Sequence, residues 1–238
     1  MRLEGLDAPE THYQATGLGL LRQPGPSSGA AADALLHHLG FRSIRRDKNE
    51  KVLETLPEAV HGTLALSRTD RFGRAVGWVF RGLARHMDGS EQPLLPAMIP
   101  HSLNGVLLEL GHAYPTFYTT LPRALRDGCS RLSKKAQVAR RGVWAHDCTH
   151  EGFLLDITVM SDRQQLVWPK LFRRLADHQG RLQSPCTLES WKIALDHHVG
   201  TVYLESAECS LPFSQLLHAE GDVCRLLTPM ENVVFSAQ

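Results

Sequence analysis

The chain has 238 residues and a mass of 26.5 kDa, enough for one large domain or two small ones with a substantial buried core. Apolar residues make up 42% of the chain and charged residues 21%, the composition of an ordinary globular protein. The formal net charge is only +1, which excludes a global field that attracts the chain to nucleic acid. Any such attraction must come from local clusters of basic residues.

The cysteines and the apolar runs indicate a compartment. There are five cysteines, an odd number with no C-x-x-C spacing, which argues against a disulfide framework and for a reducing environment. No apolar run is long enough to span a membrane, and the N-terminus lacks the apolar segment of a signal peptide. We therefore expect a cytoplasmic protein without a membrane partner. The sequence leaves the oligomeric state open.

The first ten residues combine a short apolar strand with charged side chains. Arg2, Asp7 and Glu10 lie on or beside this strand, which breaks at Ala8-Pro9. Carboxylate oxygens suit hard cations such as Ca²⁺ or Mg²⁺, and a guanidinium suits a phosphate. The segment therefore has the residue types of a phosphate-handling site.

The next stretch is predicted to contain a loop, a helix and an excursion. Residues 11–27 are rich in Gly, Pro and Gln, which predicts a mobile loop. A helix is predicted at about residues 28–41, because apolar residues recur at helical spacing, Ser27 or Ser28 can cap it, and a glycine ends it. The charged run at residues 42–58 is interpreted as a solvated excursion, and a strand follows at about residues 60–66.

Residues 68–74, with the sequence Arg-Thr-Asp-Arg-Phe-Gly-Arg, predict a turn that leads into a strand. The turn formers are Thr69, Asp70 and Gly73. The apolar residues that alternate at the period of a strand with one buried face are Val76, Trp78 and Phe80. Arg74 therefore lies where the strand begins, and from a rigid sheet edge its guanidinium can reach a phosphate.

Two helices follow a connector at residues 82–100. The first is predicted at residues 103–111, capped by Ser102 and ended by Gly111, and the second at about residues 121–141. The aromatic residues between the helices are Tyr114, Phe117 and Tyr118. The basic residues predicted on the exposed face of the second helix, where they would raise non-specific affinity for nucleic acid, are Arg131, Lys134, Lys135 and Arg140.

The C-terminal ninety residues predict a small α+β appendage. Its predicted elements are a strand at residues 153–160, helices at 169–179 and 187–198, and a strand at 201–206. The run from His146 to His150 contains metal-binding residue types, but zinc sites typically need four spaced ligands and no second cluster is evident. We therefore expect no metal site in that run.

Taken together, the two charged segments resemble the staphylococcal-nuclease-like (thermonuclease) family. The resemblance rests on Arg-x-x-x-x-Asp-Ala-Pro-Glu at residues 2–10 and on residues 68–74. Three further blocks follow in that family's order, namely the helix at 28–41, the helix at 103–111 and the basic helix that ends in Arg-Arg-Gly-Val-Trp. The resemblance divides the chain into a nuclease-like domain at residues 1–147 and a C-terminal α+β extension of unknown role at residues 148–238.

The resemblance implies both a fold and an activity. The fold is an α+β architecture with an OB-fold-type β-barrel, incomplete at the N-terminus, and helices packed on it. The activity is hydrolysis of phosphodiester bonds in DNA or RNA with Ca²⁺ or Mg²⁺ as the cofactor.

Roles for individual residues follow from the same resemblance. Asp7 and the backbone carbonyl of Ala8 would bind the metal, and Glu10 would be the general base. Arg2 and Arg74 would clamp the phosphate. The residues expected to contact the nucleic acid are Arg71, Tyr114, Tyr118, Lys134 and Lys135.

One departure from the family keeps alternatives open. The family has a further metal-binding aspartate between its first two strands, whereas this chain begins at what would be the third strand. Either the barrel is shortened, or C-terminal strands such as residues 153–160 close it and supply an acid such as Asp156. An alternative function is a nuclease-like module that binds nucleic acid or protein without turnover. A third interpretation is that the first ten residues only pack.

Overall fold

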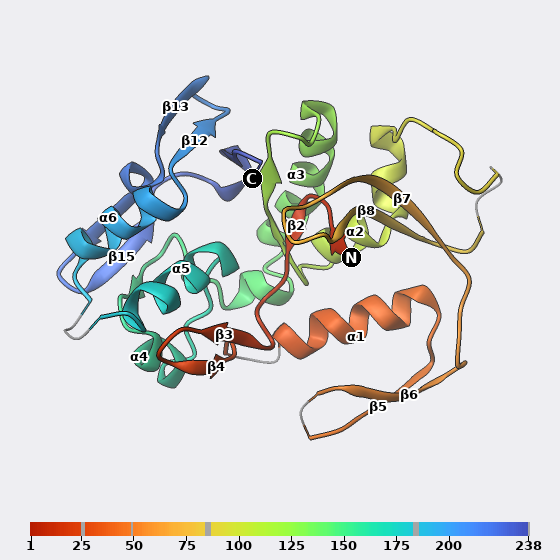
Figure 1. Ribbon diagram of the computed structural model, residues 1–238, viewed down its shortest axis with the longest axis horizontal. Coiled ribbons are helices and arrows are strands. Elements are labelled where there is room, and N and C mark those ends of the chain that lie inside the picture. The colour runs from red at the N-terminus through yellow and green to blue at the C-terminus, as the bar shows by residue number, and fades with distance from the viewer. Residues whose placement is uncertain (25–26, 49, 84–86, 183–185, 238) are drawn as a thin grey trace.

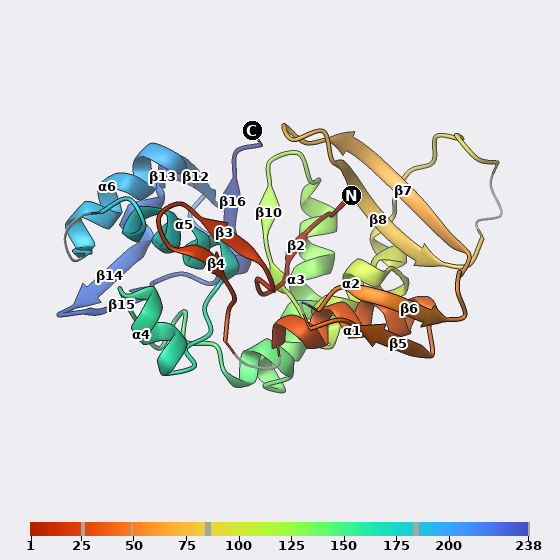
Figure 2. The same cartoon turned by 60° about the horizontal axis from the view of Figure 1, so that its bottom comes forward.

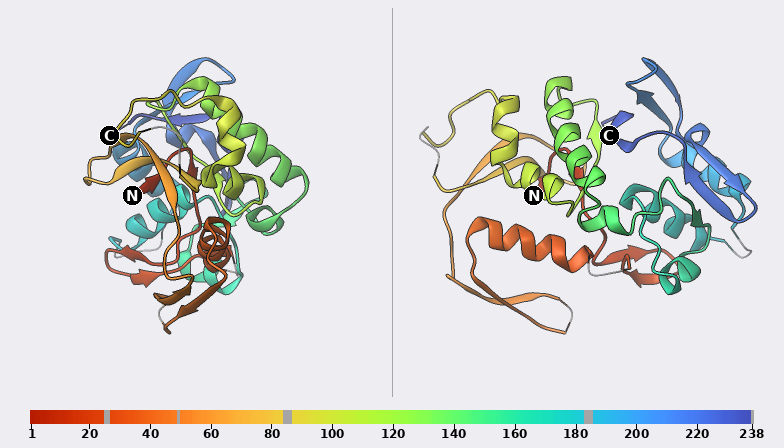
Figure 3. Two further views of the ribbon diagram at one scale, coloured as in Figure 1. Left: turned by 90° about the vertical axis from the view of Figure 1, so that its right-hand side faces the viewer. Right: turned by 180° about the vertical axis from the view of Figure 1, so that it is seen from behind.

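The structure is a computed structural model that describes residues 1–24, 27–48, 50–83, 87–182 and 186–237, without the side chains of residues 27 and 28. Helices and strands mix along the whole chain, so the α+β class is confirmed. Figure 1 shows α1 (Ser27–Leu39), α2 (Leu103–Glu109) and α3 (Arg123–Val138) on one side and α4 (Ile157–Asp162), α5 (Pro169–Gln179) and α6 (Leu188–His198) on the other. The hairpin of β3 (Tyr13–Ala15) and β4 (Gly19–Leu21) lies with α4 and α5, and both chain ends lie near the junction. The views in Figures 2 and 3 agree with this arrangement.

The first sheet joins the start of the chain to the predicted hairpin. Its strands, in spatial order, are β1 (Arg2–Leu3), β8 (Ala75–Arg81) and β7 (Gly62–Thr69). β1 runs parallel to β8, with Arg2 opposite Val76, whereas β7 and β8 are antiparallel. The prediction of one buried face on β8 is wrong, because Val79 is buried as well as Trp78. Both side chains belong to the same buried core.

Helices pack against this sheet. They are α1 (Ser27–Leu39), the 3₁₀ helix η1 (Pro96–His101), α2 (Leu103–Glu109) and α3 (Arg123–Val138). The three predicted α-helices are confirmed, with ends shifted by one to three residues. The Ser102 hydroxyl accepts a hydrogen bond from the backbone N–H of Gly105 at 3.0 Å, so the predicted N-cap of α2 is confirmed. The predicted cap at Ser27 or Ser28 lies outside the described side chains.

A buried asparagine of α2 ties the first segment to β8. The Asn104 side-chain nitrogen donates to the carbonyls of Glu4 at 2.9 Å and Gly77 at 3.1 Å. Its side-chain oxygen accepts from the backbone N–H of Val79 at 3.2 Å. The Gly77 carbonyl also accepts from the backbone N–H of Glu4 at 2.9 Å, but the Glu4 carbonyl and the Val79 N–H depend on Asn104, which has no exposed surface. It thereby fixes where the charged N-terminal segment lies.

We expect Asn104→Ala to lower the free energy of unfolding by roughly 2–3 kcal/mol, because it leaves buried backbone groups without partners. Urea denaturation followed by circular dichroism measures this loss. Val138→Ala is the control, since Val138 is an exposed residue of α3, and it should change stability little. An Asn104→Ala loss no larger than that of the control would contradict the role given to this side chain.

The remaining strands form three two-stranded sheets and two larger sheets. The pairs are β2 (Leu6–Asp7) with β9 (Tyr114–Pro115), β3 (Tyr13–Ala15) with β4 (Gly19–Leu21), and β5 (Ser43–Arg46) with β6 (Val52–Leu56). One sheet has the order β10 (Phe117–Tyr118), β16 (Val233–Phe235), β12 (Thr201–Leu204) and β13 (Cys209–Pro212). The other has the order β11 (Phe153–Leu154), β15 (Val223–Leu226) and β14 (Leu217–Glu220). The helices of this part are α4 (Ile157–Asp162), α5 (Pro169–Gln179) and α6 (Leu188–His198), with the 3₁₀ turns η2 (Gly142–Ala145), η3 (Phe213–Leu216) and η4 (Met230–Asn232).

The parts of the chain before and after residue 147 share one sheet and both cores. β16, the last strand, pairs in parallel with β10, and Val234 lies in the core beneath α2 and α3. Conversely, Tyr114 and Trp144 lie in the core that α5 and α6 cover. The C-terminal segment is therefore packed into the rest of the molecule. The predicted division at residue 147 stays a prediction.

Three predictions for local structure need correction. The predicted loop at residues 11–27 contains the β3–β4 hairpin, which closes at Gly17 and Gly19 with positive φ. The excursion at residues 42–58 contains the β5–β6 hairpin. The predicted strand at residues 153–160 is mostly α4, because Asp156 caps a helix there, accepting from the N–H groups of Thr158 and Val159.

The described strands form several small sheets and no closed barrel. Asp156 is used as a helix cap, so the suggestion that residues 153–160 close a barrel and bring this acid into a metal site is wrong. Within the ranges given above, no helix is long and apolar enough to cross a membrane.

Candidate functional site

A cavity of about 700 Å³ lies where the N-terminal segment, the β7–β8 turn, α5 and the chain end after β16 meet. It brings together the two charged segments that the sequence singles out. Its cationic lining residues are Arg2, Arg68, Arg71, Arg74, Lys170, Arg173 and Arg174. Its carboxylates are Asp7, Glu10, Asp70 and Asp177, and its aromatic residues are Tyr13, Phe72, Tyr118 and Phe235. Cations outnumber carboxylates, so the cavity suits an anion.

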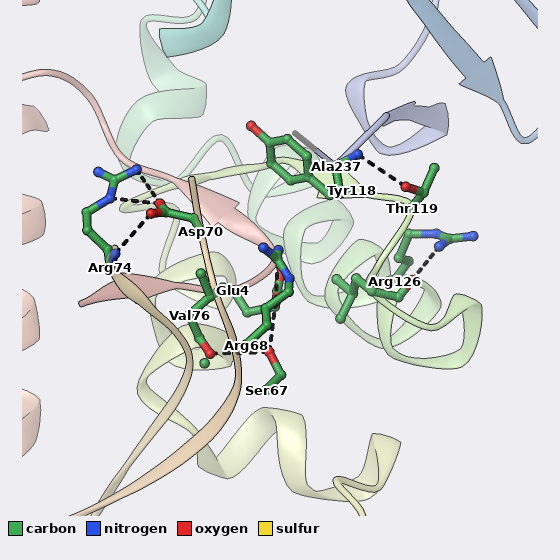
Figure 4. Close-up of polar contacts among 12 residues, drawn as sticks. Glu4, Ser67, Arg68, Asp70, Arg74, Val76, Tyr118, Thr119, Arg126 and Ala237 are labelled. Atoms are coloured by element: carbon green, nitrogen blue, oxygen red, sulfur yellow. Dashed lines mark hydrogen bonds and ion pairs between the residues drawn. The ribbon is translucent and has the colours of Figure 1, made fainter. Parts of the chain in front are cut away.

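The turn between β7 and β8 holds Arg74 at the cavity. The Asp70 carboxylate accepts from the backbone N–H groups of Phe72 and Arg74, both at 3.0 Å, and from Arg74 Nε at 2.8 Å (Figure 4). Gly73 has a φ of +75°, which favours glycine at this place in the turn. The hydrogen bond from the Arg74 side chain is the main cause that lowers the pKa of Asp70 to about 2. The turn predicted from the sequence is therefore confirmed, and Asp70 orients Arg74.

Arg173 of α5 contacts both carboxylates of the N-terminal segment. Its Nη2 lies 2.5 Å from Asp7 Oδ2 and its Nη1 lies 3.2 Å from Asp7 Oδ1, and Nη1 also donates to Glu10 Oε1. The three side chains are about one-fifth exposed. Asp7 and Glu10 are therefore adjacent, as the sequence predicts, but a guanidinium lies against them.

The protonation of this cluster follows from its burial and its charges. Burial raises the pKa of the Glu10 carboxyl, and the Arg173 guanidinium, which lowers it, does not offset that shift. Burial alone would lower the pKa of Arg173, but the charges of Asp7 and Glu10 raise it above its ordinary value. Arg173 is therefore a permanent cation, and Glu10 is a stronger base than an ordinary glutamate.

The arrangement does not fit the metal site that the resemblance implies. Ca²⁺ takes roughly six to eight oxygen ligands, whereas both carboxylates here are engaged by Arg173. In the part of the chain that the structure describes, no group of three or more His, Cys, Asp or Glu residues could hold a metal ion. A divalent cation at Asp7 and the Ala8 carbonyl would have to displace the guanidinium.

Lys170 and Arg2 both lie against Tyr118. The Lys170 ammonium lies 3.2 Å from the Tyr118 hydroxyl and 4.1 Å from the centre of the Phe235 ring. The Arg2 guanidinium lies 4.6 Å from the centre of the Tyr118 ring. Burial raises the pKa of Tyr118, but the charges of Lys170 and Arg2 outweigh it, so the net shift is downward. Tyr118 therefore lines the cavity between two cations.

Some predicted contact residues lie away from the cavity. Tyr114 is fully buried, and its hydroxyl donates to Asp147 at 3.0 Å, so it cannot stack on a base in this arrangement. Lys134 and Lys135 are on the exposed face of α3, where Lys135 pairs with Glu109 at 3.3 Å. Of the predicted nucleic-acid contacts, only Arg71 and Tyr118 line the cavity. Phe117 lies in the core.

The cationic residues of α5 are functional candidates that the motif comparison missed. The boundaries of α5 match the prediction, and its buried side chains include Leu171, Phe172 and Leu175. A second face, formed by Lys170, Arg173, Arg174 and Asp177, recurs at i, i+3, i+4 and i+7 and lines the cavity. That periodicity was the available signal, but it cannot show what the face meets.

Comparisons with known proteins add no assignment. No protein-family model matches the chain, and no curated protein is significantly similar to it. The resemblance to the thermonuclease family therefore rests on the two charged motifs and on the order of the blocks that follow them.

Proposed function

We propose that this chain is a nuclease-like phosphodiester hydrolase that acts on DNA or RNA in the basic cavity. The observation that carries the proposal is that Arg2, Asp7, Glu10 and Arg74, which the resemblance assigns to catalysis, all line one cavity although they come from two distant segments. The OB-type barrel that the resemblance implies stays a prediction of the same kind.

The charges of the cavity suit the chemistry. A phosphodiester resists attack because its negative charge repels nucleophiles, so an enzyme must neutralise that charge. Arg2 and Arg74 supply guanidinium groups, each of which can bind two phosphate oxygens at once. Glu10, with its raised pKa, is suited to accept a proton from the attacking water. Arg173 would orient this carboxylate.

The turn also offers a place for a base. Phe72 is 69% exposed at the cavity, so its ring is accessible to a ligand. Arg71 and Arg74 lie 4.8 and 5.3 Å from the centre of its ring. A flat ring flanked by cations can stack on a nucleobase while the cations meet the phosphates, which favours nucleic acid over an isolated phosphate as the ligand.

The second candidate function is binding of nucleic acid without turnover. The observation that favours it is that Arg173 donates to Glu10, which competes with the role of that carboxylate as a base. The same cavity would then hold the strand but leave it intact under every divalent cation supplied.

We expect the wild-type chain to bind and cleave a single-stranded oligonucleotide, in assays run in parallel with Ca²⁺, with Mg²⁺ and with EDTA. Glu10→Gln should lower cleavage by at least about 100-fold. It should not weaken binding, because it removes a negative charge from the cavity. Arg74→Ala should weaken binding by about tenfold, since it removes a phosphate contact. Gel analysis of the products and fluorescence anisotropy measure the two effects.

Matched controls are Glu58→Gln and Arg163→Ala, which change exposed residues outside the cavity. Both should leave cleavage and binding within about twofold of the wild type. If Glu10→Gln and Arg74→Ala both cleave as fast as the wild type, the hydrolase proposal is wrong. Binding that depends on Arg74, without cleavage under any condition, would establish the second candidate instead.

A further inference from the structure

We propose that Lys170 of α5, together with Arg2, binds a phosphate group of the ligand without a divalent cation, because Arg173 already supplies the cation that Asp7 and Glu10 require. This inference rests on the proposed function for the identity of the ligand. It assigns a role to α5, which lies outside the segment that carries the resemblance.

The first step is the charge balance around Arg173. Two adjacent carboxylates repel each other unless a cation lies between them, and in many phosphodiesterases that cation is a metal. Here the guanidinium binds Asp7 through two nitrogens and also reaches Glu10. The guanidinium is mostly buried and donates hydrogen bonds to both carboxylates. A divalent cation therefore has to compete with an intramolecular partner that is always present.

The second step is the isolation of the Lys170 charge. Lys170 is only 9% exposed, and no carboxylate of the described residues forms an ion pair with it. Its contacts are the Tyr118 hydroxyl and the faces of two aromatic rings. Burial lowers its pKa, which is the sign of an ammonium that lacks a compensating anion. Since the ammonium faces the cavity, an anionic ligand is the partner that would compensate it.

The third step is the position of Arg2. The Arg2 guanidinium and the Lys170 ammonium lie 4.6 and 5.2 Å from the centre of the same Tyr118 ring. In the described part of the chain, Arg2 forms no direct ion pair either, although the charge of Asp7 contributes to its raised pKa. Two cations without a direct ion pair on one aromatic residue form a site for one phosphate, with the Tyr118 hydroxyl as a further hydrogen-bond donor.

The test uses the full chain, a fluorescein-labelled oligothymidylate read by anisotropy, and inorganic phosphate read by calorimetry, all in EDTA. Lys170→Met should weaken both interactions by about tenfold, because it removes a charged contact. It should leave the melting temperature unchanged or higher, since it replaces a buried ammonium with an apolar chain of similar length. Lys51→Met, at an exposed residue outside the cavity, is the matched control and should change neither interaction.

The outcomes separate this inference from the proposed function. If the chain binds phosphate through Lys170 but does not bind the oligonucleotide, the inference is supported and the proposed nucleic-acid function is contradicted. A folded Lys170→Met chain that binds both probes as the wild type does would overturn the inference and leave the hydrolase proposal standing. The inference also fails if neither probe binds, or if either probe binds only when Ca²⁺ is added.

A second measurement concerns the metal directly. Calorimetry with Ca²⁺ alone should give no binding to the wild-type chain up to about 1 mM. Arg173→Gln should create Ca²⁺ binding, and adding Asp7→Asn should abolish it. Wild-type binding of Ca²⁺ that Asp7→Asn removes would show that Arg173 does not take the place of the metal. The wild-type titration decides this point even if Arg173→Gln fails to fold.

Discussion

Replacing Arg173 with alanine is expected to lower the free energy of unfolding at pH 7 by about 3–5 kcal/mol. The reason is that Asp7 and Glu10 would remain adjacent, largely buried and without the guanidinium that neutralises them. The loss should shrink as the pH falls, because the raised pKa of Glu10 means that this carboxyl takes up a proton above the usual range, and a neutral acid no longer repels Asp7. Urea denaturation at pH 8 and at pH 5 measures both effects.

Two further variants separate charge from packing. Arg173→Ala combined with Asp7→Asn and Glu10→Gln should recover most of the lost stability, because both negative charges are removed. Arg174→Ala is the matched control on the same helix. Among the described residues the ion-pair partner of Arg174 is Asp177, at 3.6 Å, so Arg174→Ala should lower the free energy of unfolding less than Arg173→Ala does. An Arg173→Ala loss that is the same at both pH values and is not rescued would contradict the charge cluster.

Replacing Trp168 with alanine is expected to lower the free energy of unfolding of the chain by about 3–5 kcal/mol. Trp168 is fully buried, and its ring packs against Phe213 and Phe235, with centroids 6.2 and 5.5 Å away. Its Nε1 donates to the Thr116 hydroxyl at 2.9 Å. Because Thr116 belongs to the segment that resembles a nuclease, the loss should destabilise both parts of the chain together.

Differential scanning calorimetry tests this expectation. The wild type should unfold in one transition, and Trp168→Ala should shift that single transition to lower temperature. Trp168→Phe, which keeps much of the ring packing, should shift it less. Two separate transitions, of which the substitution moves only one, would show instead that residues 148–238 form an independent domain.

The elements that the sequence predicts well are those with local signals. α5 begins at Pro169 and ends before Gly180, and Thr187 caps α6 with a capping box. In both helices the spacing of the apolar residues and the residues at the ends indicate the same boundaries. Residues 153–160 were mistaken for a strand because a short apolar run suits either structure, and the capping by Asp156 decided for a helix. The β3–β4 hairpin was missed because glycines occur both in loops and in tight turns.

The candidate site was predictable only in part. Asp7, Glu10 and Arg74, which the two charged motifs single out, line one cavity. Arg173 and Lys170 were not predicted, since they reach Asp7 and Tyr118 across 166 and 52 residues of sequence. A pairing over such a distance depends on how β16 and α5 pack, and no periodicity within α5 encodes it.

The most direct test of the phosphate site is a crystal structure of the full chain with a short single-stranded oligonucleotide in EDTA. The predicted result is a phosphate within hydrogen-bonding distance of Arg2, Arg74 and Lys170, with Arg173 still bound to Asp7 and Glu10. The contradicting result is a strand bound along the basic face of α3, at Arg131 and Lys134, with no phosphate in the cavity.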